Sequence, residues 1–290
     1  MEIKFKKQYE IYLAPTLDKH WYFVDEVIKG KKKRLGCFPS ITTILNAYPF
    51  SEQLVKYIAD KGYNESRELR DEAGRSGTKI HDAIEKLLDK EELTDEFYKL
   101  EEWNKIHSFA KWYEEYRPEI IKLELPVFSK KLQIAGRVDC VAKVNGELCV
   151  IDWKSSRNIH SSYYLQVAAY ALAIEEMTDL KVENTAILQV GASNKNGYRY
   201  VIEPDWKDNV EVFKGVYKTW NYDNKKQGAE KVEPPILELP KTIKLNINME
   251  NETLNPTEVT EEPKALVLTD EQVEDTEGVV STDVAVEPAV

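Results

Sequence analysis

The stretch from 134 to 170 constrains the fold of this chain more than any other part of its sequence. An Asn-Gly pair at 145–146 lies between two runs in which apolar residues alternate, which is the pattern of a two-residue β-hairpin turn. Folding back at this turn places Asp139 opposite a position near Asp152. Because Asp152 and Lys154 are two residues apart, they leave their strand on the same face. The sequence therefore predicts a hairpin that brings two acids and a lysine together.

Charged side chains on one face of a largely apolar strand need a compensating partner. An unpaired buried charge costs several kcal/mol or shifts its pKa. A bound metal ion is the simplest compensation for the two acids. The alternative is a plain β-hairpin with a solvated salt bridge between Asp152 and Lys154.

The motifs of this stretch resemble those of the PD-(D/E)XK nuclease superfamily, in its RecB-like exonuclease branch, which includes mitochondrial exonucleases and many phage recombination nucleases. A bare D…DxK pattern arises often by chance. The hairpin spacing, the apolar strand, the lysine and a following Gln/Tyr helix make the resemblance more specific. The matching segments are Gly136-Arg137-Val138-Asp139, Val150-Ile151-Asp152-Trp153-Lys154-Ser155 and Gln166-x-x-x-Tyr170.

The resemblance implies a role for each residue of the hairpin. Asp139, Asp152 and Lys154 would form the catalytic set, in which Lys154 orients or deprotonates the attacking water. The metal ligands would be Asp139, Asp152, the backbone carbonyl of Trp153 and the imidazole of His81. This hard-ligand set suits Mg²⁺ or Mn²⁺.

Further candidate residues lie outside the hairpin. Gly77-Thr78-x-x-His81 resembles the histidine motif of the family, although a lone histidine beside an apolar stripe is more often structural. Glu85 and Glu124 are candidates for a second metal or a supporting role, with a surface carboxylate as the alternative for Glu124. Gln166 and Tyr170 lie one helical turn apart, and the resemblance implies that they reach DNA; otherwise they are simply half-buried.

The net charge of −11 is strongly segregated along the chain. Residues 242–290 contain twelve Asp/Glu and two Lys, which leaves 39 acidic against 38 basic residues in 1–241. The same C-terminal segment contains none of the 30 aromatic residues, so it cannot bury enough apolar surface to order itself. We predict a nuclease domain over 1–241, with an N-terminal hairpin and helical cap over 1–118 and a catalytic core over 119–241. A disordered acidic tail over 242–290 would follow.

Composition also limits the cofactors and the location. No run approaches the ~18 apolar residues that span a membrane, and the first residues lack the apolar core of a signal peptide. We therefore expect an intracellular, cytoplasmic protein, in the host cytoplasm if a phage encodes it, with no membrane partner. Three cysteines, Cys37, Cys140 and Cys149, cannot supply the four ligands of the iron–sulfur cluster that some relatives carry. No phosphate-cradling glycine loop is present, so no ATP use is expected.

The order of helical and strand patterns predicts an α/β fold, a restriction-endonuclease-like mixed sheet flanked by helices with an N-terminal helical cap. The basic run at 29–34 is either a solvated hairpin tip or a phosphate contact. The long helix at 94–116 should bury Trp103, Ile106, Phe109, Ala110 and Tyr113. The predicted elements are a hairpin over 8–28, helices beginning after Ser40 and Ser51, a helix over 63–73, a break at 74–78, helices over 79–90, 94–116, 163–177 and 206–222, and strands over 119–128, 185–192 and 198–202.

The leading prediction is a divalent-metal-dependent DNA exonuclease that acts on free, single-stranded ends in recombination, repair or replication. The alternatives are a structure-specific endonuclease and a DNA-binding module that keeps the nuclease fold without turnover. A pure binding module has no need to keep Asp139, Asp152 and Lys154 together, which argues against the last. A recombination or single-strand-binding protein is a candidate partner for the acidic tail.

Overall fold

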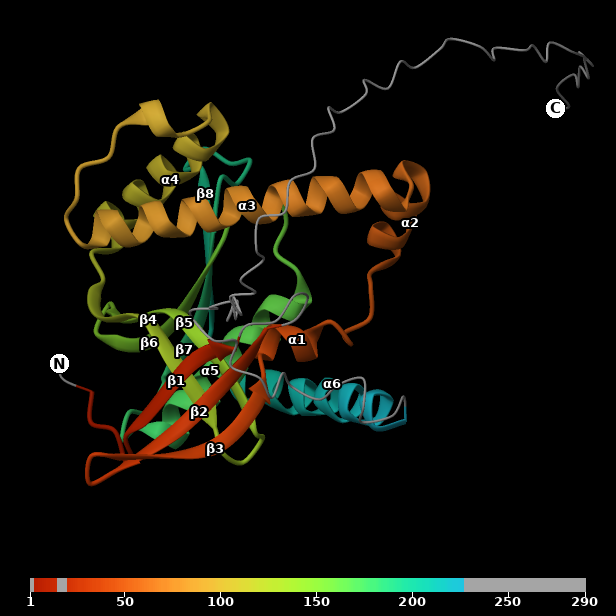
Figure 1. Ribbon diagram of the computed structural model, residues 1–290. Coiled ribbons are helices and arrows are strands. Elements are labelled where there is room, and N and C mark those ends of the chain that lie inside the picture. The colour runs from red at the N-terminus through yellow and green to blue at the C-terminus, as the bar shows by residue number, and fades with distance from the viewer. Residues whose placement is uncertain (1–2, 15–19, 227–290) are drawn as a thin grey trace, which may run out of the picture. The chain divides into compact units, whose positions relative to one another are not determined.

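The computed structural model describes residues 3–14 and 20–226, which contain two β-sheets and the helices around them (Figure 1). The first sheet has three antiparallel strands in the order β1-β2-β3, and the second has five strands in the order β4-β5-β6-β7-β8. The strands are β1 (Tyr9–Ala14), β2 (Trp21–Ile28), β3 (Lys31–Pro39), β4 (Glu119–Ser129), β5 (Ile134–Val144), β6 (Glu147–Lys154), β7 (Asn184–Val190) and β8 (Tyr198–Glu203).

The predicted hairpin is the centre of the five-stranded sheet. Strands β5 and β6 pair antiparallel, and both residues of their turn have positive φ, 53° at Asn145 and 90° at Gly146, as a tight hairpin of this kind requires. Strands β6 and β7 are parallel, so the chain must cross over between them, and α5 (Ser161–Met177) makes this crossover. The remaining pairs are antiparallel, which gives the predicted mixed sheet.

Helices cover both faces of this sheet, as the sequence predicts. On one face, α5 and α6 (Trp206–Lys226) pack with Val150 and Ile187. On the other, α3 (Tyr63–Leu88) and α4 (Leu100–Tyr116) pack with Ile151 and Leu188. Consecutive strand residues therefore bury opposite sides, the period-two alternation of a sheet buried on both faces.

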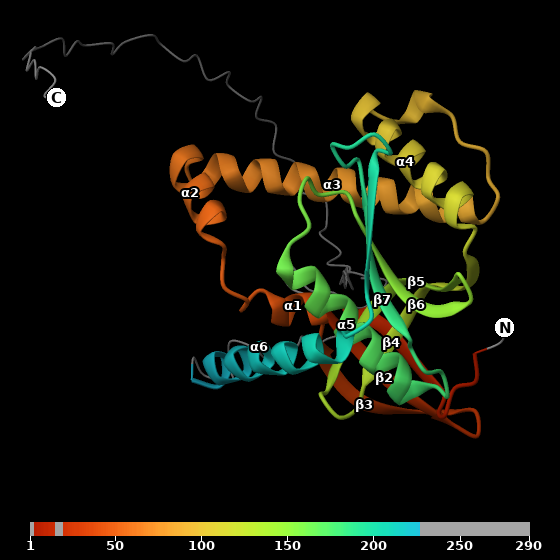
Figure 2. The same ribbon diagram turned by 180° about the vertical axis from the view of Figure 1, so that it is seen from behind.

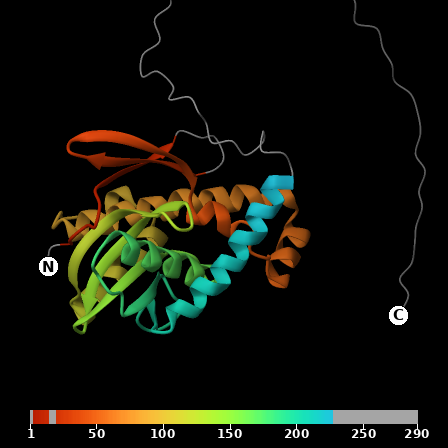
Figure 3. The same cartoon turned by 90° about the horizontal axis from the view of Figure 1, so that it is seen from below.

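The three-stranded sheet packs on β4 and β5, on the side away from α5 (Figure 3). The contact is aromatic: the Phe128 ring of β4 lies 5.6 Å from that of Tyr9 and 4.8 Å from that of Phe38, between ring centroids. The sequence predicts only a hairpin in this region and misses β3. The reason is that β3 is an edge strand that begins inside the basic run, and lysine on an edge strand hides the apolar alternation.

The predicted N-caps are confirmed. Ser40 Oγ accepts a hydrogen bond from the Thr43 N–H at 2.9 Å at the start of α1 (Ile41–Leu45). Ser51 Oγ accepts one from the Leu54 N–H at 3.2 Å at the start of α2 (Glu52–Lys61). Each hydroxyl satisfies one of the N–H groups that a helix leaves unpaired at its beginning.

The predicted break at 74–78 is wrong, because α3 runs through it as one helix (Figure 1). A glycine destabilises a helix interior by about 1 kcal/mol relative to alanine but does not forbid it. Gly77 has a packing role instead, since a Cβ at this position would lie 3.3 Å from Ser155 Oγ, just after β6. His81 therefore stands on a long, continuous helix that passes close to the end of the hairpin.

The helix predicted over 94–116 begins later, and its buried face is partly different. A short 3-10 turn, η1 (Asp95–Phe97), precedes α4. Ile106 and Phe109 are buried as predicted, but Trp112 is fully buried whereas Tyr113 is 38% exposed. Trp112 packs against Trp153 of β6 with 5.9 Å between ring centroids, which sets the rotation of the helix.

The predicted acidic tail and the boundary at 241/242 lie outside the described residues, and both stay predictions. Within the described ranges, no helix combines the length and the hydropathy needed to cross a membrane. Figure 2 shows the described elements from behind, with α5 and α6 in front of the five-stranded sheet.

Candidate active site

The candidate site opens where β5 and β6 stop pairing with each other. Their ladder ends at Cys140 opposite Ile151. Beyond this pair the Trp153 N–H donates to Asp139 Oδ2 at 2.8 Å, so a side-chain oxygen takes the place of a backbone carbonyl. From here β5 continues beside β4 and β6 continues beside β7. Asp139 is therefore fixed at the point where the two halves of the sheet diverge.

Glu124 of β4 is held beside Asp139 by an interruption of the neighbouring ladder. Leu123 pairs with Cys140 and Leu125 with Val138, and Glu124 lies between them with a φ of 45°. This left-handed conformation costs a residue other than glycine about 1–3 kcal/mol, and such strain collects at functional sites. The strained backbone supports a functional role for the Glu124 carboxylate over a plain surface position.

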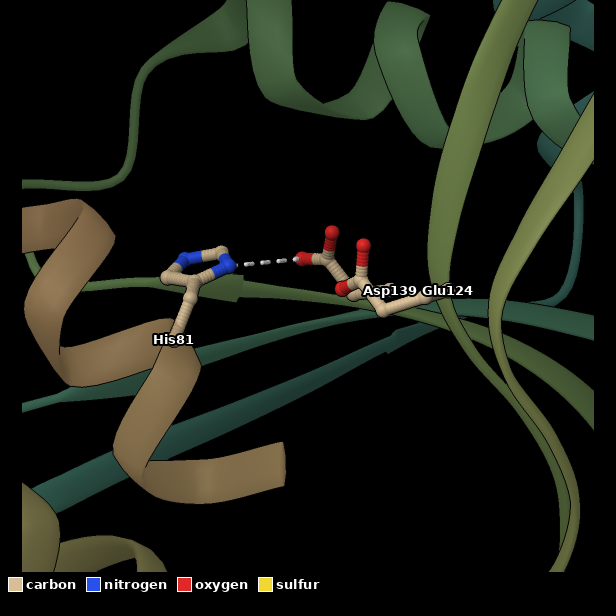
Figure 4. A group of neighbouring side chains, drawn as sticks. All are labelled: His81, Glu124 and Asp139. Carbon is tan, nitrogen blue, oxygen red and sulfur yellow. Dashed lines mark ion pairs between the residues drawn. The ribbon is translucent and has the colours of Figure 1, made fainter. Parts of the chain in front are cut away.

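His81 of α3 completes a group of three potential metal ligands. Its Nδ1 lies 3.7 Å from Asp139 Oδ2. His81, Glu124 and Asp139 each present one ligand atom, and these atoms all lie within 4.8 Å of one another. Figure 4 shows the imidazole facing the two carboxylates, which come from neighbouring strands. One nitrogen and two carboxylates from three separate elements converge on a single point.

Asp152 and Lys154 form a second, adjoining group on β6. Asp152 is 1% exposed, and its Oδ2 lies 2.5 Å from Lys154 Nζ. Gln166 of α5 bridges the pair: its Nε2 donates to Asp152 Oδ1 at 3.1 Å, and its Oε1 accepts from Lys154 Nζ at 3.2 Å. The same Nε2 lies 3.1 Å from the Tyr170 hydroxyl, and the Tyr163 ring lies under the Lys154 ammonium. The two charges are paired with each other and bridged by Gln166, and Asp152 Oδ2 has no hydrogen-bond partner beyond this ion pair.

Gly136 allows α5 to approach the hairpin closely enough for these contacts. A Cβ at this position would lie 2.6 Å from a ring carbon of Tyr170, which is closer than real side chains approach. Tyr170 is buried and cannot move aside cheaply. The glycine that begins the Gly-Arg-Val-Asp motif therefore permits the packing that brings Gln166 to Asp152.

Burial and crowding of the acids shift their pKa values upward. Burial and the neighbouring Asp152 raise the pKa of Asp139 well above its usual range. Burial and the Asp139 carboxylate raise the pKa of Glu124 to about 7. These shifts are the expected result of placing like charges together in a poorly solvated site. A divalent cation would remove this repulsion, and the donor set of one imidazole and hard carboxylates fits Mg²⁺ or Mn²⁺.

The basic side chains of the site have pKa shifts in opposite directions. Burial lowers the pKa of His81, which keeps the imidazole neutral and leaves a lone pair for a metal. Burial alone would lower the pKa of Lys154, but the carboxylates of Asp152 and Asp139 outweigh it and raise the pKa above its ordinary value. Lys154 therefore keeps its positive charge at neutral pH.

A scan against protein families matches residues 54–238 to the model described as the PD-(D/E)XK nuclease superfamily. The match covers more than half of the 290-residue chain. This protein belongs to that superfamily. Its members use divalent metal ions, which agrees with the converging His81, Glu124 and Asp139 ligands.

Curated relatives of this PD-(D/E)XK chain carry the name mitochondrial genome maintenance exonuclease 1. The human protein is 30% identical over 161 residues, which cover 49% of this chain and 45% of the relative. The Xenopus tropicalis protein is 32% identical over 155 residues, covering 48% and 44%. The mouse protein is 45% identical over 58 residues, covering 18% and 17%. The chain thus spans less than half the length of the curated relatives it matches.

The other sequence-predicted residues lie at or near this superfamily site. The Trp153 N–H hydrogen-bonds to Asp139 Oδ2, which places this residue beside the centre, and ligation of a metal by its carbonyl stays a prediction. Glu85 is exposed one turn after His81 and lies outside the converging group, although its charge contributes to the raised pKa of Glu124. Gln166 and Tyr170 are buried and engaged with each other, so their contact with DNA stays a prediction.

Gln189 of β7 is a supporting residue that the sequence reasoning missed. It lies opposite Lys154 in the parallel ladder and is buried. Its Nε2 donates to the carbonyls of Ser156 at 2.9 Å and Arg157 at 2.7 Å, which fixes the loop that follows Lys154. The available signal is a lone glutamine in the otherwise apolar run Ala-Ile-Leu-Gln-Val.

Proposed function

We propose that this chain is a divalent-metal-dependent DNA exonuclease that hydrolyses phosphodiester bonds from free, single-stranded ends, in recombination, repair or replication. The observation that carries the proposal is the apposition of two groups in one PD-(D/E)XK site. One group is a set of crowded ligands, His81, Glu124 and Asp139, and the other is the paired Asp152 and Lys154.

The choice of exonuclease and of DNA rests on the relatives. Three curated proteins that the chain resembles are named as genome maintenance exonucleases, and the similarity covers less than half of each. Because the substrate is DNA, we place the site of action inside the cell. The names of the relatives point to mitochondria, and a phage-encoded chain would act in the host cytoplasm.

We assign the metal to His81, Asp139, Asp152 and the Trp153 carbonyl, with Glu124 as a further carboxylate ligand. When bound, Mg²⁺ or Mn²⁺ supplies charge neutralisation at the phosphate and acidifies a coordinated water. The Trp153 N–H orients the Asp139 carboxylate through their hydrogen bond. Asp152 would then share its carboxylate between the cation and Lys154, because each of its two oxygens can hold one of them.

Lys154 is assigned to the chemical step. Its charged ammonium is held within the site by Asp152 and Gln166 and can offset negative charge that develops on the phosphoryl oxygens. Gln166 is assigned a positioning role, because it hydrogen-bonds to the acid and the lysine and also to the Tyr170 hydroxyl. Neither role requires the cation to be in contact with Lys154.

End-labelled linear and circular single-stranded DNA, incubated with purified protein and Mg²⁺, Mn²⁺ or EDTA, tests the proposal. Linear strands should be degraded from an end with either metal, and circles should survive, whereas EDTA should stop all release of nucleotides. Rapid nicking of closed circles would replace the exonuclease with a structure-specific endonuclease. Binding of DNA without any product, with every divalent ion, would leave a binding module that has the nuclease fold.

A further inference from the structure

The basic side chains of the described chain are concentrated around the three-stranded sheet. Residues 3–14 and 20–39 contain eight Lys/Arg and three Asp/Glu, although residues 1–241 as a whole carry a net charge of only −1. All eight of these basic residues are exposed. They are Lys4, Lys6, Lys7, Lys29, Lys31, Lys32, Lys33 and Arg34.

The turn between β4 and β5 adds Lys130 and Lys131 to the same surface. The N-terminal segment docks there, since the Lys6 N–H donates to the Met177 carbonyl at 2.8 Å at the end of α5. The carboxylate of Glu26 accepts a hydrogen bond from Lys7 Nζ at 2.5 Å and also lies in the field of Lys33 and Lys130, which all lower its pKa. Three segments that are distant in sequence therefore place their lysines together.

Four of these lysines, Lys6, Lys7, Lys130 and Lys131, border two adjoining cavities of about 570 and about 260 Å³. Lys6, Lys130 and Glu176 line both cavities. Apolar side chains, among them Leu172 and Phe128, form the remaining walls. The surface is therefore hollowed, with ammonium groups on its rim.

The acids of these cavities are already engaged by other groups. Glu176 Oε1 accepts from Ser129 Oγ at 3.1 Å, and its Oε2 accepts from the Lys131 N–H at 3.3 Å. Glu175 Oε1 accepts from the Val182 N–H at 3.0 Å. Among the residues that the structure describes, the ammonium groups of Lys130 and Lys131 have no ion pair or hydrogen bond. Two cations at this rim are thus available for an external anion.

We propose that Lys6, Lys7, Lys33, Lys130 and Lys131 form a second phosphate-binding site, the lysine patch, which holds the backbone of the DNA substrate away from the active site. This inference rests on the proposed function for the identity of the polyanion. Lysine is suited to the task because it binds phosphate as a point charge without reading the base.

The position of the lysine patch sets how much DNA it needs. Gln166 touches Asp152 in the active site, and Glu176 lines the patch at the other end of α5. Ten helical residues span about 15 Å at 1.5 Å each. One strand of a duplex carries a phosphate about every 3.4 Å, so this distance corresponds to about four nucleotides. A strand shorter than that cannot occupy both sites.

The test compares Lys130→Gln/Lys131→Gln with the matched control Lys207→Gln/Lys218→Gln, which removes two exposed lysines of α6. Fluorescence anisotropy with a labelled 20-nucleotide single strand in EDTA measures binding without cleavage. Each lost phosphate contact lowers the slope of log Kd against log salt by about 0.7 for a single strand. The slope should be lower by about 1.4 in the patch variant and unchanged in the control. Both variants should keep the Tm of the wild type. Lys33→Gln, on a different strand, provides an independent second arm with a loss of about 0.7.

Strand length distinguishes this inference from the proposed function. A two-nucleotide strand is too short to occupy both sites, so the loss of affinity in the patch variant should be much smaller for this strand than for the 20-nucleotide strand. Equal salt slopes for wild type and patch variant on the long strand, or equal losses in patch and control variants, would overturn the lysine patch even if the protein degrades DNA. If only the patch variant loses slope and the wild type releases no nucleotides with any metal, the lysine patch would be supported and the proposed nuclease function would be overturned.

Discussion

The two halves of the candidate site handle buried charge in opposite ways. In the half made by His81, Glu124 and Asp139, two carboxylates and a neutral imidazole face one another, and the carboxyl pKa values are raised. In the half made by Asp152 and Lys154, an acid and a base lie 2.5 Å apart. The first half is crowded with like charge, whereas the second neutralises itself.

This difference indicates which half needs a cation from outside. The Arg137 guanidinium lies 2.7 Å from Glu124 Oε2, but Arg137 is well exposed, so water screens the pair. Lys154 is mostly buried and held by Gln166 as well as Asp152. We therefore expect the crowded half to hold the metal, with Asp152 as the one ligand from the paired half, and Lys154 to act on the phosphate.

The largest effect is expected from Asp139→Ala, which removes the carboxylate that faces both His81 and Glu124. Divalent-ion binding and nuclease activity should be lost together, because a hard cation loses a charged oxygen at the centre of its site. Activity should fall by more than about 10⁴, beyond the effect of one electrostatic donor. Asp82→Ala, an exposed acid of the same helix as His81, is the control and should retain both. Metal binding that survives in Asp139→Ala would show that the crowded half does not hold the metal.

Lys154→Ala should separate metal binding from chemistry. Lys154 is not one of the assigned metal ligands, so the affinity of the variant for Mg²⁺ or Mn²⁺ should be kept or increased. Single-turnover cleavage should slow by a factor of about 10² to 10⁴, the scale of one positioned proton-transfer group or electrostatic donor. Lys143→Ala, at the far end of the same hairpin, is the matched control. Cleavage at the wild-type rate in Lys154→Ala would argue for binding without catalysis.

His81→Ala should have an intermediate effect on the crowded half. The variant keeps both carboxylates but loses the nitrogen ligand, so metal affinity should fall by about 10- to 100-fold, the scale of altered metal-site support. Activity should be partly restored at high Mn²⁺, because both carboxylates remain and still attract the ion. Activity that is unaffected at low metal would assign His81 a purely structural role.

The smallest effect concerns the pH dependence of stability in EDTA. The pKa of Glu124 is raised to about 7 in the folded state, against about 4.5 when unfolded. Between these values the folded carboxyl holds a proton that the unfolded one has lost, so this group makes the protein less stable as pH rises from about 4.5 to 7. The contribution is at most about 3 kcal/mol. The Tm values of the wild type and Glu124→Gln should converge near pH 4.5, and the wild type should have the lower Tm at pH 7.5. A difference in Tm that stays constant across this range would contradict the crowding of Glu124.

The hairpin and its charged residues could be predicted from the sequence because the signals are local. An Asn-Gly turn between alternating strands fixes the register within a few residues, and this register brings Asp139 to Trp153 and keeps Asp152 beside Lys154. The following helix could also be predicted, because Leu165, Ala169 and Leu172 form an apolar face at helical spacing, and the resemblance points to Gln166 on the opposite face.

The rest depended on contacts that the sequence does not display. Glycines at 74–78 indicate a helix break by propensity, yet α3 runs through them, and Gly77 lies close to Ser155, a long-range contact. The left-handed backbone of Glu124 follows from the interrupted ladder with β5, which no local pattern reveals. Gln189 could be recognised as a polar residue in an apolar strand, but its hydrogen bonds to the loop after Lys154 are long-range.

Calorimetric titration of Mn²⁺ into the wild type, Asp139→Ala and Lys154→Ala tests most directly whether the crowded half holds the metal. We expect a binding event in the wild type, its loss in Asp139→Ala and its retention in Lys154→Ala, which then cleaves linear single strands slowly. Equal binding in all three proteins, or loss of binding only in Lys154→Ala, would contradict the assignment of the metal to the crowded half and of the phosphate to Lys154.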